Sequence, residues 1–379
     1  MRATLADARL ARYAGQFVWL ELDFDNPNNQ PFLSQHGVTN TPSFFVLDPA
    51  NEQSCATQLG AMTLQELIGF LDRGERGFLT ITKSPADEAR ARGDQFLAGA
   101  SHDKAARAYR EALRLADSAW PERDSTVASL VWALMSSKQW QACAETAASE
   151  AARVGRGGAF GRIVVSGLMA VSQGEQAPWA QAAATILEPF AEEAIALPTT
   201  VRDHRFQLYQ NLMLLAQGRG EKARVERLSE RWLHELDETR PESDDERSAL
   251  DIARVDAASI LGDPSRVLPA LVSSEQAMPN NYNASLRLAQ MEILAKRYDE
   301  AVRACDRGLA HVTGPLGRAW LLQTKADALM QQRQPADARR VLEQALRAAR
   351  AIGVPQARDN NILRITDAIK EAQKQENEH

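Results

Sequence analysis

Residues 92–113 read RGDQFLAGASHDKAARAYREAL. Alanine, leucine, arginine, glutamate and glutamine dominate this stretch, and all five are good helix formers. Small residues interrupt it at Gly93, Gly99 and Ala105. The same texture continues to the C-terminus, so the sequence from Ala86 onward is predicted to be almost wholly helical.

The quoted stretch closely resembles a tetratricopeptide repeat, which is a pair of helices joined by a turn. The resemblance implies that Gly93 and Ala105 are the small residues at the crossing of the two helices, and that Gly99 lies at the turn. The apolar positions that it assigns to the groove between repeats are Phe96, Tyr109 and Ala112.

The same arrangement recurs near the C-terminus. Ala301 and Ala338 occupy equivalent positions and are 37 residues apart, close to the period of about 34 residues in this repeat. A more divergent unit spans residues 130–150, where Trp140 and Cys143 occupy the turn and crossing positions. Cys143 and Cys305 fall where helical hairpins need small residues, so both are interpreted as packing residues.

Between about residues 158 and 278 the repeat consensus fades, but the helical period persists. The helices expected there are Phe160–Val171, Pro178–Leu197, Arg202–Gln217, Lys222–Leu236, Arg247–Leu261 and Pro264–Gln276. Residues 80–379 are therefore predicted to form an all-α solenoid of about seven hairpins, ended by a capping helix at Ile362–Gln375. Such stacks have a groove that binds peptides or partner helices.

Residues 1–79 mix strand-like and helix-like segments. Phe17–Asp23 is dense in strand formers and is predicted to be a buried strand. The other expected elements are strands at Ser43–Leu47 and Cys55–Leu59 and a helix at Thr63–Asp72. Two glycines between Arg73 and Gly77, followed by Pro85, make residues 73–85 the best candidate for a linker to the helical part.

The run from His36 to Leu47 resembles the segment around the cis-proline of thioredoxins. In that family a helix ends in Gly-Val or Gly-Ile, as Gly37 and Val38 do here, and Thr-Pro leads into a central strand. The resemblance covers about residues 5–73. The resemblance implies that the bond between Thr41 and Pro42 is cis, a conformation that X-Pro bonds tolerate. It also implies that these two residues form the edge where a substrate peptide docks. The expected fold is a partial α/β thioredoxin-like domain followed by the helical array, mostly α overall.

Thioredoxins also carry a CxxC motif, and this sequence has none. Its three cysteines are far apart in sequence, and Cys55 is expected to be a small, buried, inert thiol. Met1 falls about where the CxxC would stand. Either an in-frame CxxC precedes Met1 in a longer product, or the chain is truncated and inactive in redox chemistry. We favour the first, because the Phe17–Asp23 strand would otherwise have unpaired backbone groups.

The composition makes several kinds of partner and site unexpected. The formal net charge is −6 and aromatic residues make up 6%, so no nucleic-acid partner is expected. No apolar run is long enough for a membrane span, and no cofactor, metal site or catalytic residue is expected. As written, the N-terminus lacks a signal peptide and predicts a cytoplasmic protein, whereas a longer product with a signal would be periplasmic or exported.

Three functions remain open. The leading hypothesis is a module that binds protein or peptide clients through the repeat groove. The alternative is a thiol–disulfide oxidoreductase of redox homeostasis, whose CxxC lies upstream of Met1. The third is a structural scaffold. The sequence leaves open the oligomeric state and the identity of the client.

Overall fold

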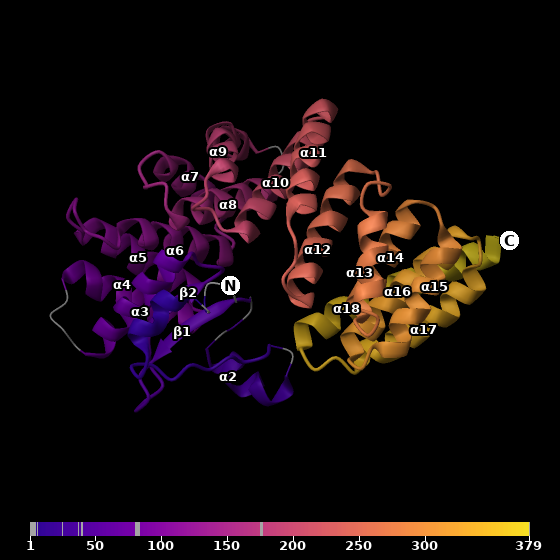
Figure 1. Ribbon diagram of the computed structural model, residues 1–379, viewed down its shortest axis with the longest axis horizontal. Coiled ribbons are helices and arrows are strands. Elements are labelled where there is room, and N and C mark those ends of the chain that lie inside the picture. Colours follow the sequence, from indigo (N-terminus) through magenta and orange to yellow (C-terminus); the bar gives the residue numbers. More distant parts are fainter. Residues whose placement is uncertain are drawn as a thin grey trace. The chain divides into compact units, whose positions relative to one another are not determined.

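The computed structural model describes residues 5, 7–24, 26–36, 38, 41–79, 84–174 and 177–378. The chain forms two compact units, Met1–Leu215 and Ala216–His379, which are treated in turn. Figure 1 shows the succession of elements along each unit.

Helical hairpins make up most of the first unit. Its helices are α4 (Pro85–Ala98), α5 (His102–Leu115), α6 (Arg123–Ser136), α7 (Trp140–Ala151), α8 (Gly158–Gln173), α9 (Pro178–Ala196) and α10 (Arg202–Gly218), the last of which runs past the boundary of the unit. Each of α4, α6 and α8 packs on the helix that follows it, while α6 also packs on α8 and α7 on α9. We call the first helix of each hairpin its leading helix.

The hairpin of α4 and α5 has the predicted crossing. A Cβ added at Gly93 would lie 2.5 Å from Cε1 of Tyr109, so only glycine allows the two helices to approach this closely. Ala105 and Tyr109 are fully buried. Helix α4 begins with a capping box, in which the Ser84 hydroxyl accepts from the backbone N–H of Asp87 and the Asp87 side chain accepts in return.

The turns repeat one backbone conformation. Gly99 ends α4, but the residue with positive φ is the next one, Ala100, at 51°. Lys138, Lys296 and Arg333 have φ values of 59°, 61° and 60° at the corresponding turns of later hairpins. The expected array of helical hairpins is therefore confirmed.

The second unit continues with further helices. They are α11 (Lys222–Glu238), α12 (Asp244–Leu261), α13 (Leu268–Ala277), α14 (Tyr282–Leu294), α15 (Tyr298–His311), α16 (Pro315–Gln331), α17 (Pro335–Arg350) and α18 (Pro355–Glu378). The leading helices α12, α14 and α16 pack in a row that ends at α18. Small residues of the repeat, among them Ala301, Ala326 and Ala338, are fully buried. Helix α13 begins later than expected, at Leu268, and α18 is longer than the predicted capping helix.

An α/β segment precedes the helices. Strands β1 (Ser43–Leu47) and β2 (Ser54–Leu59) pair antiparallel, and α3 (Leu64–Phe78) packs on both. The minor helices are η1 (Ala8–Tyr13), η2 (Pro27–Asn29) and α2 (Gln30–Gln35). The strands at 43–47 and 55–59 and the cis Thr41–Pro42 bond are thus confirmed. Gly37, where the resemblance predicts the end of a helix, lies outside the described residues.

The strand predicted at Phe17–Asp23 is wrong, because these residues form no strand. Val18 is 89% exposed and Leu20 is 80% exposed. A strand needs a partner for its backbone groups, and among the described residues the sheet holds only β1 and β2. Two short strands do not make a thioredoxin-like sheet, so a domain of that family is not shown.

The linker expected from residue 73 is also wrong in its first part. Helix α3 continues to Phe78, and its glycines serve close packing rather than chain flexibility. A Cβ at Gly74 would lie 2.6 Å from Cγ2 of Val46, and one at Gly77 would lie 2.9 Å from the carbonyl oxygen of Cys55. Residues 80–83 of the expected linker lie outside the described residues, and Ser84 and Pro85 begin α4.

Candidate functional site

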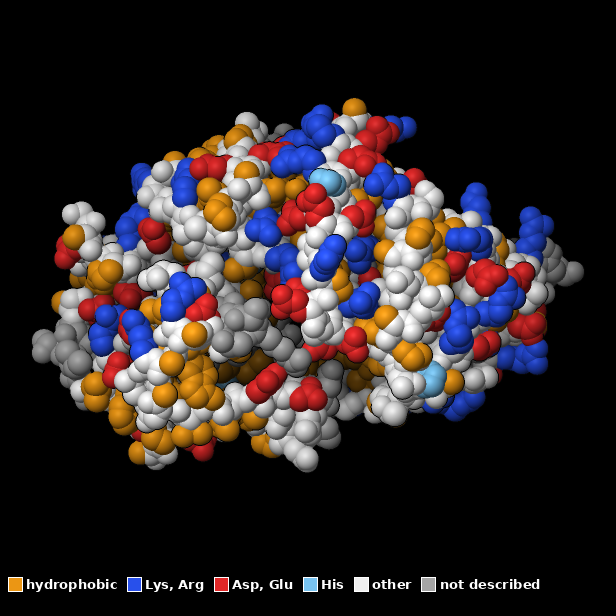
Figure 2. All heavy atoms as spheres, in the orientation of Figure 1, with side chains coloured by type: hydrophobic (Ala, Val, Ile, Leu, Met, Phe, Trp, Pro, Cys, Tyr) orange, Lys and Arg blue, Asp and Glu red, His pale blue; other side chains and the backbone are white. Residues whose placement is uncertain are grey.

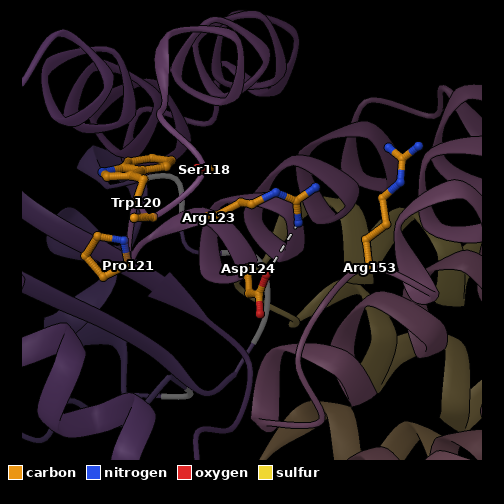
Figure 3. Close-up of a pocket in the computed structure, with 7 residues that line it drawn as sticks. Ser118, Trp120, Pro121, Arg123, Asp124 and Arg153 are labelled. Atoms are coloured by element: carbon orange, nitrogen blue, oxygen red, sulfur yellow. Dashed lines mark hydrogen bonds and ion pairs between the residues drawn. The ribbon is translucent and has the colours of Figure 1, made fainter.

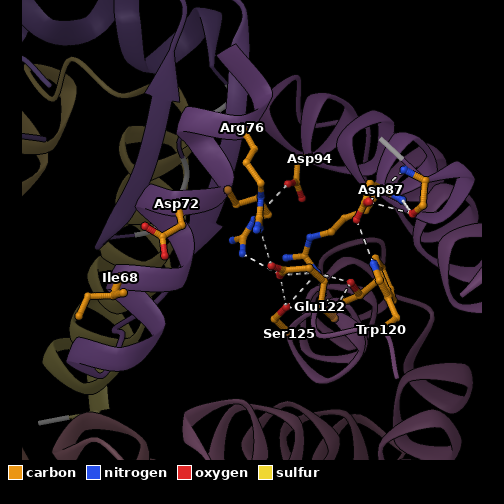
Figure 4. Close-up of polar contacts among 12 residues, drawn as sticks. Ile68, Asp72, Arg76, Asp87, Asp94, Trp120, Glu122 and Ser125 are labelled. Atoms are coloured by element: carbon orange, nitrogen blue, oxygen red, sulfur yellow. Dashed lines mark hydrogen bonds and ion pairs between the residues drawn. The ribbon is translucent and has the colours of Figure 1, made fainter. Parts of the chain in front are cut away.

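A buried ion network joins α3 to the first helices of the array (Figure 4). Glu122, just before α6, accepts from Nη1 of Arg73 at 3.0 Å and from Nη2 of Arg76 at 3.1 Å. Arg90 of α4 donates through Nη1 to the carbonyl oxygen of Glu122 at 3.2 Å. Tyr109 donates to Asp94 at 2.7 Å. Side chains from α3, α4, α5 and the start of α6 therefore meet in one network.

Burial controls the ionisation of this network. Burial lowers the pKa of Arg73 to about 10, with nearby Arg90 acting in the same direction. Burial raises the pKa of Asp94. The pKa of Glu122 is also pushed up by burial, but the charges of Arg90 and Arg73 outweigh this and lower it. Because each charge faces an opposite one, the network holds the α/β segment on the leading helices.

A small cavity lies where the end of β2 meets the leading helices. Its lining residues are Gln58, Leu59, Gly60, Leu97, Ala128, Ser129, Trp132, Arg162, Val165, Ser166, His204 and Gln207. They come from the β2 end and from α4, α6, α8 and α10. The α/β segment therefore borders the face of unit 1 that the leading helices form.

Three of the residues that line the cavity have buried side-chain nitrogen atoms without a hydrogen-bond partner among the described residues. These nitrogen atoms are Nε and Nη1 of Arg162, Nε1 of Trp132 and Nδ1 of His204. Nη2 of Arg162 lies 2.7 Å from Oε1 of Glu66, which is an ion pair without hydrogen-bond alignment. Burial, together with the charge of Arg162, lowers the pKa of His204 to about 3. His204 is therefore neutral at neutral pH.

Sequence reasoning did not assemble this group. The sequence patterns singled out neither Arg162 nor His204. The available signal was Arg162 itself, an arginine within the apolar run of Phe160–Val171. Such a residue is rarely buried without a partner.

Thr41 and Pro42, the predicted docking edge, lie at the start of β1. Thr41 is exposed and Pro42 is half-buried. The carbonyl oxygen of Pro42 accepts from the backbone N–H of Gly60 at 2.9 Å, so the pairing with the β2 side extends one step beyond the strand. No described strand pairs with the other edge of β1.

A second, more open depression lies beside the start of α6 (Figure 3). Arg123 and Arg153 border it together with Trp120. Both guanidinium groups pair with Glu150, at 2.5 Å for Arg123 and 3.4 Å for Arg153. Their charges are already compensated, so this depression does not present a free cationic site.

The three cysteine thiols differ in how far they are exposed to solvent. Cys143 and Cys305 are fully buried, and burial raises the pKa of each to about 12. Both are therefore packing residues, as predicted. Cys55 is only half-buried, which is more access than expected.

Other kinds of site are not found in the described part of the chain. It contains no group of three or more histidine, cysteine, aspartate or glutamate side chains able to hold a metal ion. None of its helices is both long enough and apolar enough to cross a membrane. Basic and acidic side chains interleave over the face visible in Figure 2 rather than separating into fields of one sign.

No family model matches the chain, and no curated protein matches it. The similar solved structures include the following two. A tetratricopeptide repeat protein from Parabacteroides merdae ATCC 43184 has a TM-score of 0.49 and 10% identity, over 77% of this chain and all of that one. The TPR2AB-domain:pHSP90 complex of yeast Sti1 has a TM-score of 0.30 and 14% identity, over 76% of this chain and 98% of that one. Both TM-scores lie below 0.5, so the fold is described from the helical hairpins of this chain alone.

Proposed function

We propose that this chain is a protein-binding module, in which a tetratricopeptide-type array engages client proteins through its leading helices. The observation that carries this proposal is the placement of exposed apolar side chains in unit 2. Ile252, Leu294, Trp320 and Leu363 lie on α12, α14, α16 and α18, one on each helix of the row. Among the described residues of this unit, Val272 of α13 is the one other large apolar side chain exposed to this degree.

Single exposed apolar residues are normal on a protein surface, but the presence of four of these five on one row of helices is not required for folding. Burying each of them against a client removes apolar surface from water, which favours binding. Helical arrays present such rows to peptides or to partner helices. The client segment is therefore expected to contribute apolar side chains rather than a strongly charged surface.

The test uses a defined ligand. A peptide selected from a displayed library against the full chain is labelled, and its Kd is measured by fluorescence anisotropy. Combining Ile252→Glu, Trp320→Glu and Leu363→Glu should weaken binding at least about tenfold, because truncation of central apolar contacts has effects of this size. Val272→Glu is the matched control and should leave the Kd unchanged. Equal binding by the triple variant, or an equal loss in the control, would contradict the proposal.

We propose as a second candidate function thiol–disulfide exchange by a longer product, which is favoured by the position of Thr41 and Pro42 directly before β1. In this proposal residues 1–79 are the thioredoxin-like part, 80–379 recruit substrates, and a CxxC precedes Met1. Thr41 and Pro42 would dock the substrate strand at the edge of β1 that pairs with no described strand. A product carrying that CxxC should reduce insulin disulfides, and residues 1–379 alone should not. Turnover by residues 1–379 alone, or inactivity of the CxxC-bearing product, would reject this function.

A further inference from the structure

Residues 17–22 of the α/β segment leave large apolar side chains in solvent. Val18 is 89% exposed, Leu20 is 80% exposed and Leu22 is 40% exposed. They alternate in sequence with Phe17 and Trp19, whose rings form an edge-to-face pair at 6.2 Å. Phe17 also packs on the core of the α/β segment. One side of this stretch is therefore anchored by aromatic contacts, while every second side chain is left to water.

The backbone of the same stretch is also open. Val18, Leu20 and Leu22 make no hydrogen bond with any described residue. Backbone hydrogen bonds resume on either side, where the N–H groups of Gln16 and Asn26 each donate to the carbonyl oxygen three residues earlier. Open backbone groups beside alternating apolar side chains are what strand pairing requires. A contiguous apolar surface of this kind marks an interaction site.

The charges of this stretch indicate which partner strand fits it. A partner strand must not place a carboxylate opposite Glu21, because like charges directly opposite each other destabilise a strand pair. Antiparallel pairing with a second copy, centred on Leu20, places Glu21 opposite Trp19 and uses all of residues 17–23. A centre at Glu21 would oppose two identical carboxylates, and a centre at Trp19 would draw in Gly15, which has a φ of 79°. The stretch is therefore complementary to itself in one register.

We propose that residues 17–23 form the interface of a homodimer, in which these stretches from two copies of the chain pair as antiparallel strands. Val18 then lies opposite Leu22 of the partner subunit, and the two Leu20 side chains meet at the two-fold axis. A two-fold interface needs one patch that is complementary to itself, and this stretch meets that requirement. The interface lies in unit 1 and does not depend on the client-binding row of unit 2.

Sedimentation velocity of the full chain tests whether the dimer forms. The wild type should shift from monomer toward dimer between about 5 and about 500 µM, because an interface smaller than the standard size binds weakly. Leu20→Lys should weaken dimerisation at least about tenfold, because two lysines would oppose each other at the axis. Ile186→Lys is the matched control, since Ile186 is 48% exposed on α9. A monomer at every concentration, or a dimer that Leu20→Lys leaves unchanged, would overturn the proposal.

Single cysteines locate the centre of the pairing. In Leu20→Cys the two new thiols face each other at the axis, so oxidised glutathione should join the two copies by a disulfide. In Val18→Cys the two thiols are four residues apart along the ladder, about 13 Å, and should not be joined. Mixing Val18→Cys with Leu22→Cys should restore the cross-link, and the wild type with its half-buried Cys55 is the blank. Cross-linking of Val18→Cys as fast as Leu20→Cys, or none in Leu20→Cys, would show that the stretches do not pair in this way.

Discussion

Replacing Glu122 by glutamine should release the α/β segment from the helical array. The Glu122 carboxylate pairs with Arg73 and Arg76 and lies 4.0 Å from Nη1 of Arg90. The side chain of Arg73 is 13% exposed and that of Arg90 is 2% exposed. Without the carboxylate, these two buried guanidinium groups face the single buried carboxylate of Asp94.

The free-energy cost of Glu122→Gln follows from these contacts. Removing one partner of a buried ion pair costs about 3–5 kcal/mol, because the remaining charge is left buried. The Arg76 contact adds little, since that side chain is 52% exposed. Glutamine can still accept one hydrogen bond, so the expected cost is near the lower end, about 3 kcal/mol. This corresponds to about a hundredfold increase in the equilibrium constant for opening, at 1.4 kcal/mol per factor of ten.

Amide hydrogen exchange measures this opening directly, because segments of one protein can open separately. The amides of α3 should exchange about a hundredfold faster in Glu122→Gln than in the wild type, while those of α17 should be unchanged. Glu300→Gln is the matched control, because Glu300 pairs with Arg303 on the exposed surface of α15. Exchange in α3 within threefold of the wild-type rate, or an equal change in the control, would refute the reasoning.

Three further predictions concern packing, pH and thiol access. Gly93→Ala should destabilise unit 1 by about 1–3 kcal/mol in urea titrations, because the new methyl group overlaps the buried ring of Tyr109. The control is Gly218→Ala, which should not lower stability because its methyl group meets no atom within 4 Å. His204 has a folded pKa of about 3 against an ordinary value of 6.5, so its contribution is present above pH 6.5 and is lost as the pH falls toward 3. Unit 1 should lose about 1.4 kcal/mol between pH 7.5 and 5.5 from this residue, and a variant His204→Asn with the same pH dependence as the wild type would contradict this. In the native protein a thiol reagent should modify at most Cys55, and all three cysteines should react only after unfolding; fast native labelling of the two buried cysteines would contradict their burial.

Local patterns predicted much of the fold. The strand at Ser43–Leu47 was expected from its composition, and the helical hairpins were expected from the spacing of small and apolar residues. Gly93 could be assigned to a helix crossing because its repeat has a recognisable arrangement around it. These features depend on neighbours in sequence, which is why the sequence alone indicates them.

The wrong predictions depend on distant partners. Phe17–Asp23 has the composition of a buried strand, but composition does not show whether a neighbouring strand is present to pair with it. Gly74 and Gly77 were interpreted as linker residues, although they allow α3 to pack closely on the sheet. A sequence does not distinguish a glycine needed for flexibility from one needed for close packing.

The candidate cavity depends even more on distant contacts. It brings together Gly60, which directly follows β2, and residues 132, 162 and 204, which lie on α6, α8 and α10. Arg162 stands out in its own segment as an arginine within an apolar run, but the other three residues do not. Only the packing of the β2 end on the leading helices brings these residues to one cavity.

Hydrogen exchange of the full chain with and without a saturating client peptide tests most directly whether the leading helices bind clients. The peptide is the one selected against the wild-type chain. We predict slower exchange in α12, α14, α16 and α18, with little change in α15 and α17. Protection confined to residues 17–47, with none in the leading helices of unit 2, would contradict client binding by the array.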